Sequence, residues 1–188
     1  FDRFEVCNHG FTAIYDATHG AAVLNDCKYG VSMRDSEISL SLLRGAVNPD
    51  PAADRGSHQF LYSYYVWDGA FEDSGIVAEV AVLNAPVQVI EGSRPKTAFF
   101  TVDELNAVIE TVKLAEDGSG DLILRLYESM NGTRRAVLSS AFAFEEAWLC
   151  NMLEEPKMNL KAENNQVELK LRPFEILPLR LKKGSGFC

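Results

Sequence analysis

The sequence contains no long apolar run, few cysteines and a deficit of positive charge, and each shortage excludes a class of protein. No stretch approaches the roughly 18 consecutive apolar residues that a membrane-spanning helix requires, so we expect no membrane partner. Lys and Arg number 18 against 27 Asp and Glu, which gives a formal net charge of −9. Because nucleic acids and anionic membranes attract clustered Lys and Arg, this balance argues against either as the main partner.

The start of the chain, Phe1-Asp2-Arg3-Phe4-Glu5, is mixed and charged, unlike the apolar segment of a signal peptide. The chain also does not begin with Met. We therefore expect either a processed product or a fragment of a longer protein.

Motifs that mark a self-contained active site or a metal site are also missing. The three histidines have no metal-binding spacing, and there is no G-x-S-x-G, P-loop or G-x-G-x-x-G motif. Adjacent carboxylates such as Glu154-Glu155 are expected to be solvated. The cysteines form no C-x-x-C pair, so we expect free thiols in a reducing compartment. They are Cys7, Cys27, Cys150 and Cys188.

The composition that remains is that of an ordinary globular protein. Hydrophobic residues make up 47% and charged residues 24% of the 188 residues. At roughly 150 residues per domain, the length fits one large domain or two small ones. No repeat or linker stands out, so we favour one sandwich-type unit over residues 1–188, with subregions 1–90 and 91–188.

Alternation of apolar and polar residues is the dominant pattern. Residues 57–67 place aromatic and β-branched side chains on both faces, which predicts a strand covered on both sides. Residues 121–128 and 166–172 show the same period of two. Weaker versions of the pattern cover residues 107–114, 136–144 and 174–181.

Turn signals separate these runs and fix the predicted fold class. Asp117-Gly118-Ser119-Gly120, Asn131-Gly132 and Asn164-Asn165 each fall between expected strands. A short helix is expected over 74–84, with Ser74 as its cap. The prediction is a mainly β protein: an antiparallel, supersandwich-like β-sandwich with one or few short helices.

Two segments carry more chemistry than a plain scaffold needs. Asp26 and Lys28 lie two residues apart after an apolar strand, so on an extended chain they share a face, with Tyr29 beside them. The second segment is the proline-containing polar loop over residues 49–58, and such loops often carry function. From the residues alone, a functional loop and ordinary turn chemistry stay equally open for both.

Several motifs, in order along nearly the whole chain, resemble the C-terminal region of glycoside hydrolase family 38 α-mannosidases. Residues 45–49 and 129–150 match that region less well. The matching segments are Asn25-Asp26-Cys27-Lys28-Tyr29-Gly30, Leu40-Ser41-Leu42-Leu43-Arg44, Pro49-Asp50-Pro51, Asp54-Arg55-Gly56, His58-Gln59-Phe60, residues 109–113, 115–117, 124–128 and 153–156, and Leu171-Arg172-Pro173-Phe174-Glu175-Ile176.

The resemblance implies a retaining exo-α-mannosidase whose nucleophile, acid/base and metal ligands lie in an N-terminal catalytic domain outside this chain. None of those catalytic motifs matches a segment here. The resemblance implies no catalytic residue, metal ligand or cofactor in this chain, and a divalent metal, usually zinc, in the parent enzyme. The expected partners are the catalytic domain, which this domain supports, and an α-mannoside or oligosaccharide; homo-oligomer formation stays open. Free cysteines and the acidic balance, together with the resemblance, imply a cytoplasmic location.

The resemblance also implies that this domain contributes one residue to the active site. In several members a basic residue in an Asp-x-Arg/Lys turn reaches the pocket, and Asp26-x-Lys28 matches that pattern. We expect Lys28 to donate hydrogen bonds to a mannose hydroxyl, with Asp26 orienting it and Tyr29 adjacent. An ion pair that fixes a strand end is the alternative. A stand-alone carbohydrate-binding sandwich that stacks Tyr62, Tyr65 and Trp67 on sugars is the second function considered, although core packing explains these aromatics more simply.

Overall fold

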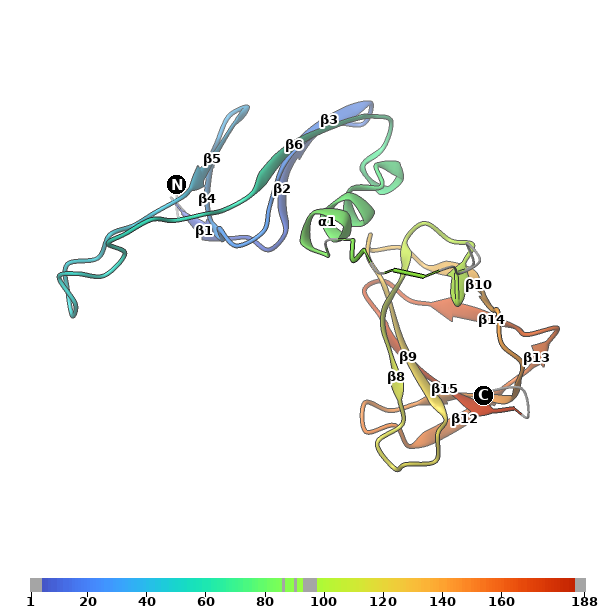
Figure 1. Cartoon of the computed structure of the whole chain (residues 1–188). Helices are drawn as coiled ribbons and strands as arrows, with labels where there is room; N and C mark the ends of the chain where they lie inside the picture. The colour runs from blue at the N-terminus through green and yellow to red at the C-terminus, as the bar shows by residue number, and fades with distance from the viewer. Residues whose placement is uncertain (1–4, 86, 90, 93–97, 185–188) are drawn as a thin grey trace. The chain divides into compact units, whose positions relative to one another are not determined.

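The computed structural model describes residues 5–85, 87–89, 91–92 and 98–184, and the chain divides into two compact units, residues 1–90 and 91–188 (Figure 1). All strand pairs in the described ranges are antiparallel, and helix is a minor component. The mainly β, antiparallel prediction is therefore confirmed. The proline-containing segment Ser93-Arg94-Pro95, whose sequence predicts a loop, lies outside the described residues, as does Cys188.

The first unit contains two three-stranded sheets, of order β1-β4-β5 and β2-β3-β6, and helix α1 packs against β3. Neither described helix is long and apolar enough to cross a membrane. The elements are β1 (Val6–Cys7), β2 (Phe11–Tyr15), β3 (His19–Asn25), β4 (Gly30–Arg34), β5 (Glu37–Ser41), β6 (Tyr62–Asp68), the 3-10 helix η1 (Phe71–Asp73) and α1 (Ile76–Asn84).

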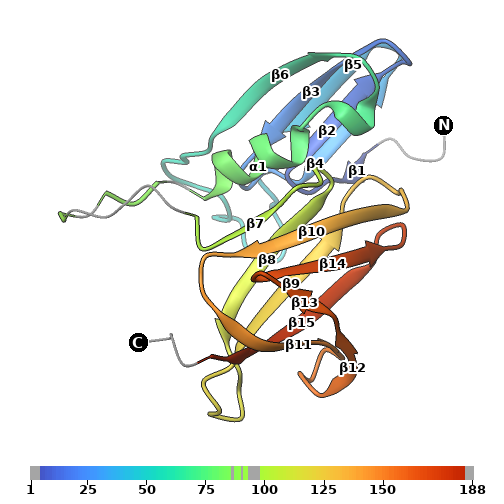
Figure 2. The ribbon, with the colours of Figure 1, turned by 90° about the vertical axis from the view of Figure 1, so that its right-hand side faces the viewer.

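One face of the β2-β3-β6 sheet packs beneath η1 and α1 (Figure 2). Ala22, Leu24 and Ile76 are fully buried there. Trp67 lies across β3 at Gly20, where a Cβ atom would come within 2.1 Å of the indole ring. Glycine is thus required at position 20, because any side chain would displace the tryptophan.

Strand β6 corrects the prediction for residues 57–67 in two ways. The strand begins at Tyr62 rather than at residue 57. Its faces also differ, because Trp67 is buried whereas Tyr62, Tyr64 and Val66 are 59%, 72% and 59% exposed. The expectation of a strand covered on both faces is therefore wrong for the described residues. Aromatic alternation cannot distinguish a face covered within this chain from one that is not.

The predicted helix is present, but its cap is shifted by one residue. Helix α1 covers Ile76–Asn84, and Gly75, in the left-handed region at φ +68°, occupies the N-cap position. Ser74 still contributes, because its hydroxyl accepts a hydrogen bond from the Ile76 N–H at 3.3 Å, and its carbonyl accepts one from the Tyr65 hydroxyl at 2.6 Å. Tyr65 is thereby tied to the helix side of the sheet.

The second unit is a β-sandwich of a four-stranded sheet, order β13-β14-β10-β7, and a five-stranded sheet, order β12-β11-β15-β9-β8. Its strands are β7 (Phe100–Val102), β8 (Ala107–Leu114), β9 (Leu122–Glu128), β10 (Arg134–Ser140), β11 (Phe144–Cys150), β12 (Pro156–Leu160), β13 (Ala162–Glu163), β14 (Gln166–Leu171) and β15 (Ile176–Lys183).

Alternating aliphatic residues from both sheets form the core of this unit. Leu124 and Leu126 of β9 meet Leu138 of β10 and Leu171 of β14, and all four side chains are fully buried. A period of two places these side chains on one face of each strand, as the sequence predicted. Glu110 lies at a bulge in the edge strand β8 and is exposed.

The turns of the second unit follow the predicted chemistry. Asn131, Asn164 and Asn165 all have positive φ angles, between +52° and +61°, which asparagine tolerates better than most residues. The turn over 117–120 is held from β15, because Arg180 bonds Asp117 at 2.7 Å. Hydrogen bonds from Ser119 and Arg180 lower the pKa of Asp117 to about 2.

Glu154 departs from the expectation that adjacent carboxylates are solvated. Its carboxylate is almost fully buried, lies 2.8 Å from the Lys113 ammonium and accepts the Glu116 N–H at 2.9 Å. These partners lower its pKa, led by Lys113. The contacts of this turn residue with Lys113 of β8 and the Glu116 backbone explain its burial, and sequence adjacency gives no sign of them.

Glu128 is the most deeply buried acid of this unit and organises two loops. Its carboxylate accepts the Met130 N–H at 3.0 Å and the Phe174 N–H at 2.9 Å, and Arg134 lies 3.7 Å away. Burial opposes the charged form, but these N–H groups and Arg134 together hold the pKa below its ordinary value. The charge is therefore part of the native fold.

We predict that Glu128→Gln lowers the free energy of unfolding by about 1–3 kcal/mol at neutral pH, because the amide replaces a carboxylate that accepts charge-assisted hydrogen bonds. A depressed pKa adds stability above the unfolded-state value, and this is lost as pH falls through the folded value. The gap between variant and wild type should therefore narrow in acid. Urea unfolding at pH 7 and pH 3 measures this; a constant gap would contradict the ionised role, and the exposed Glu110→Gln is the control.

Candidate functional site

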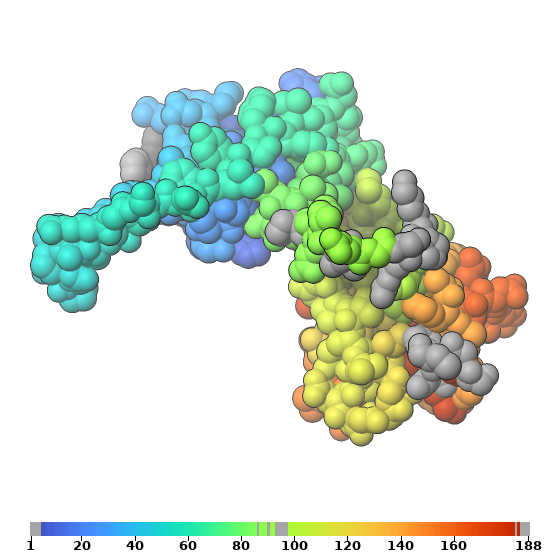
Figure 3. Space-filling view, viewed as in Figure 1, coloured from blue at the N-terminus to red at the C-terminus, as the bar shows by residue number. Residues whose placement is uncertain are grey.

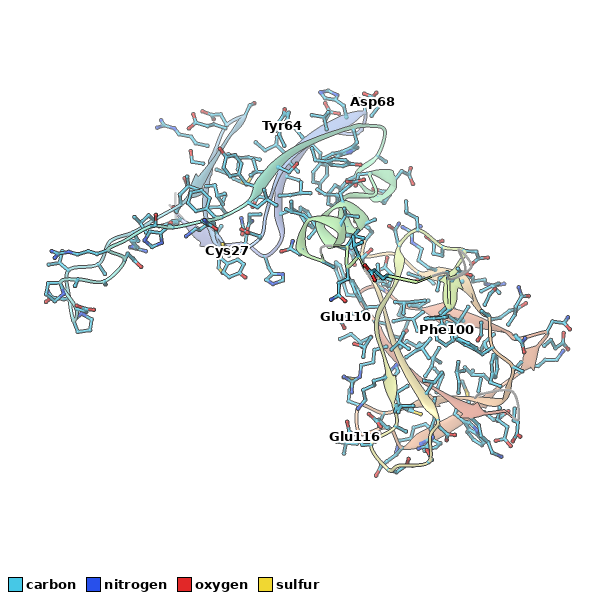
Figure 4. All side chains as sticks on the ribbon, viewed as in Figure 1. Cys27, Tyr64, Asp68, Phe100, Glu110 and Glu116 are labelled. Atoms are coloured by element: carbon cyan, nitrogen blue, oxygen red, sulfur yellow. The ribbon has the colours of Figure 1, made fainter. Side chains whose placement is uncertain are left out.

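The three residues singled out in the sequence lie in the short turn between β3 and β4. This turn is closed by Asn25, whose side chain is buried at the end of β3. The Asn25 amide oxygen accepts the Lys28 N–H at 3.1 Å, and its NH₂ group lies 3.3 Å from the Asn8 side-chain oxygen. A side chain that bonds the backbone a few residues ahead fixes such a turn locally. Figure 4 shows Cys27, the middle of this turn, at the opposite end of the sheet from Asp68.

Asp26 joins the turn to the chain entering β6. Its carboxylate accepts the Leu61 N–H at 3.0 Å, and its own N–H donates to the Leu61 carbonyl at 3.2 Å. A hydrogen bond from the Cys27 thiol, followed by the Leu61 N–H, lowers the pKa of Asp26. The same contact raises the pKa of the Cys27 thiol. Asp26 is thus ionised and engaged with neighbouring backbone at neutral pH.

Lys28 is half-buried and lies against an aromatic ring. Its ammonium nitrogen is 5.1 Å from the centroid of the Phe60 ring, within the range of a cation–π contact. Among the described residues Lys28 forms no ion pair with Asp26. Tyr29 is 43% exposed and stacks on His9 with ring centroids 5.6 Å apart. The ammonium therefore keeps its hydrogen-bonding capacity while the ring restricts its position.

A shallow depression of about 290 Å³ surrounds Lys28. Arg44 and His58 line it together with two acids, Glu5 and Asp54. Glu5 lies 3.7 Å from Arg44. The lining thus offers both hydrogen-bond donors and carboxylate acceptors, which suits a polyhydroxylated ligand better than a simple ion.

The segment between β5 and β6 forms one wall of this depression and stands away from the rest of the first unit (Figure 3). Asp54 organises it, because its carboxylate accepts the Gly45 N–H at 3.2 Å and its carbonyl lies 2.8 Å from His58 Nε2. The proline-containing loop expected over 49–58 is thus present, and the structure connects it to Lys28 through their shared depression.

Sequence reasoning missed two contributors to this site. Phe60 appeared only in a predicted strand and in one of the matching segments, yet it lies before β6 and contacts Lys28. Asn25 appeared only as part of a motif, although an asparagine directly after an apolar strand is a turn signal that could have identified it. The described ranges contain no group of three or more His, Cys, Asp or Glu side chains suited to a metal ion.

Two family models match the chain, one in each unit. Residues 1–52 match the glycosyl hydrolases family 38 C-terminal domain, and residues 106–179 match the glycosyl hydrolases family 38 C-terminal beta sandwich domain. The second match coincides with the observed sandwich. The chain belongs to the C-terminal region of glycosyl hydrolase family 38.

Two named relatives align in sequence with 95–96% of this chain. Alpha-mannosidase 2C1 from Homo sapiens is 38% identical over 187 residues, and alpha-mannosidase G from Dictyostelium discoideum is 33% identical over 190 residues. The chain spans only 18% and 17% of the lengths of these two relatives.

Solved structures support the same fold. A family 38 protein from Enterococcus faecalis superposes with a TM-score of 0.74 at 20% identity, over 95% of this chain and 22% of that one. An alpha-mannosidase from Enterococcus faecalis V583 gives 0.72 at 20% identity, over 95% of this chain and 21% of that one. The arrangement of strands is therefore shared despite low sequence identity.

We predict that Asp26→Ala speeds exchange of the Leu61 amide proton at least about tenfold, because the variant loses a hydrogen bond to a charged acceptor. Hydrogen exchange followed by NMR measures this amide directly. Asp68→Ala, which removes an exposed carboxylate at the other end of β6, should leave the Leu61 rate unchanged. Equal rates in wild type and Asp26→Ala would show that Asp26 does not hold the turn.

Proposed function

We propose that this chain is the C-terminal β-region of a longer polypeptide, the parent enzyme, which is a retaining exo-α-mannosidase. The ordered matches to both C-terminal family models carry this proposal, and the names of the relatives supply the substrate class. In this proposal the chain supports an N-terminal catalytic domain and lends one residue to the rim of its substrate pocket.

The chemistry of retention assigns the bond-breaking groups to the catalytic domain. A retaining glycosidase needs a carboxylate nucleophile and an acid/base carboxyl about 5–5.5 Å apart on either side of the glycosidic bond. Any divalent metal, zinc in the usual family pattern, also belongs there, since the described residues here do not assemble three ligands. In this proposal no carboxylate of this chain takes part in breaking the glycosidic bond, and no residue of this chain binds the metal.

Lys28 is the residue we assign to substrate binding. Its ammonium has three donors, lies against Phe60 and borders a depression rich in polar groups. Asp26 positions Lys28 indirectly, because its hydrogen bonds to Leu61 fix the turn that contains Lys28. Tyr29 is exposed beside Lys28 and stacks on His9 instead of lining the depression, so in this proposal it contributes from the edge of the site. A mannose hydroxyl is the acceptor in this proposal.

The carbohydrate-binding alternative is weakened by the positions of its aromatics. Trp67 is buried and Tyr65 is bonded to Ser74 beneath the helix, so two of the three rings face the core. Of these three aromatic residues, only Tyr62 is exposed. The free thiols Cys7 and Cys27 are exposed, which supports a reducing compartment, and we propose a cytoplasmic location on that basis.

We predict that Lys28→Ala in the parent enzyme lowers kcat/KM for p-nitrophenyl α-mannoside about 10- to 100-fold, the cost of losing a hydrogen bond from a charged donor. Thermal stability should stay close to that of wild type, because Lys28 takes part in no ion pair among the described residues. Steady-state kinetics and a thermal melt on the same preparations measure both quantities.

The control is Lys157→Ala. Lys157 lies outside the depression, and its side chain is 59% exposed. It should leave the kinetics unchanged. Lys28→Arg retains a cationic donor and should recover part of the activity. Unchanged kinetics in Lys28→Ala would refute the role of Lys28 in substrate binding.

A further inference from the structure

The β2-β3-β6 sheet has one face that α1 and η1 do not cover and that β5 only borders. On this face Tyr64 and Val66 are exposed, whereas Ile14, Ala21 and Val23 are half-buried. The cross-strand rows on this face are Ile14–Ala21–Val66 and Thr12–Val23–Tyr64. We call Ile14, Ala21, Val23, Tyr64 and Val66 the open face. Tyr64 is labelled on β6 in Figure 4. All five side chains are apolar or aromatic, which is the composition of a sheet face that packs against another layer.

A broad groove runs along the open face. It has a volume of about 800 Å³, and Ile38 of β5 adds a further aliphatic side chain to its wall. Polar groups gather at one end of the groove, where Asp16, His19 and Asp68 contribute to the lining. An apolar floor with a polar rim is typical of a protein interface.

The two faces of this sheet differ in what covers them. The helix-side face is closed by α1 and η1 and buries Ala22, Leu24 and Trp67. The open face alternates with it residue by residue and is also mainly apolar, with Thr12 as the polar member of its rows, yet Tyr64 is 72% exposed. Two adjacent strands that both alternate apolar with apolar are the pattern of a sheet buried on both sides.

The length of polypeptide outside this chain identifies what covers the face. The chain spans 17–18% of its relatives, and both matching family models describe C-terminal domains. In the proposed function a large part of the remainder, including the catalytic domain, precedes Phe1. Edge strands β2 and β6 each pair only with β3 among the described residues, so a neighbouring layer can also meet the sheet at its edges.

From these observations we infer that the open face is an interdomain surface, covered by a β-layer of the same polypeptide that lies N-terminal to Phe1. The inference rests on the proposed function, because it requires the longer parent enzyme. Sheet-on-sheet packing fits the face, since β-branched and aromatic side chains in cross-strand rows interdigitate with a second sheet about 10 Å away. The parent enzyme would then bury the second face of this sheet in addition to the face under α1.

Hydrogen–deuterium exchange with mass spectrometry tests this surface without substrate. Peptides covering β6 and β2 should exchange at least about tenfold more slowly in the parent enzyme than in the 188-residue chain, because covered strands open only with the surrounding unit. Peptides from the buried strand β9 serve as the internal reference and should exchange similarly in both. Equal exchange of β6 in the two proteins would overturn the inference.

A pair of matched variants locates the effect on the open face. Val66→Asp in the parent enzyme should speed exchange of β6 at least about tenfold, since it places a charge in a covered layer. The same substitution in the 188-residue chain should change exchange by no more than about twofold, because Val66 is exposed there. Val82→Asp on α1, where the valine is 70% exposed, is the control and should have little effect in either protein.

Two other occupants would appear as distinct results. If Val66→Asp dissociated a dimer of the parent enzyme, measured by light scattering, a second copy would be the occupant. If a mannose oligosaccharide protected β6 in the 188-residue chain and Tyr64→Ala abolished that protection, the face would be a sugar platform. Either result overturns the inference. Failure of the proposed function would give a different result. The parent enzyme would then lack α-mannosidase activity, regardless of the exchange rate of β6.

Discussion

Alternation of side chains along antiparallel strands is the constraint on which both units depend. Each strand presents two faces, and every apolar face requires a covering layer. In the second unit two sheets cover one another, so Leu124 and Leu138 meet in a closed core. In the first unit helix α1 covers one face of the β2-β3-β6 sheet, and the other face is open in the described structure. The polar turn that carries Lys28 lies at the end of this same sheet.

Short-range patterns were enough to predict much of the fold. Period-two runs located β9 and β14, and asparagine located the turns at Asn131 and Asn164, because these signals act within a few residues. The coverage of Tyr64 was not predictable, since it depends on polypeptide that the strand itself does not encode. The burial of Glu154 was also missed, because its partner Lys113 is distant in sequence and only the sandwich brings them together.

The candidate site shows the same division between local and distant information. The sequence singled out Asp26, Lys28 and Tyr29 as a group, and the structure places all three in one turn fixed by Asn25. The contact that restricts the Lys28 ammonium comes from Phe60, over thirty residues away. Its proximity follows from the antiparallel pairing of β3 with β6, which returns the chain to the end of β3 where the turn begins. The proposed role of Lys28 thus depends on the pairing of β3 with β6, which brings Phe60 to the turn.

The most direct test of the account compares the parent enzyme with the 188-residue chain on p-nitrophenyl α-mannoside, with NMR identifying the anomer first released. The account predicts that the parent enzyme releases α-mannose, the retained configuration, and that the chain alone releases none. Hydrolysis by the 188-residue chain would contradict the assignment of the catalytic groups to another domain. A parent enzyme that releases β-mannose first, or that hydrolyses no α-mannoside, would contradict the assigned reaction.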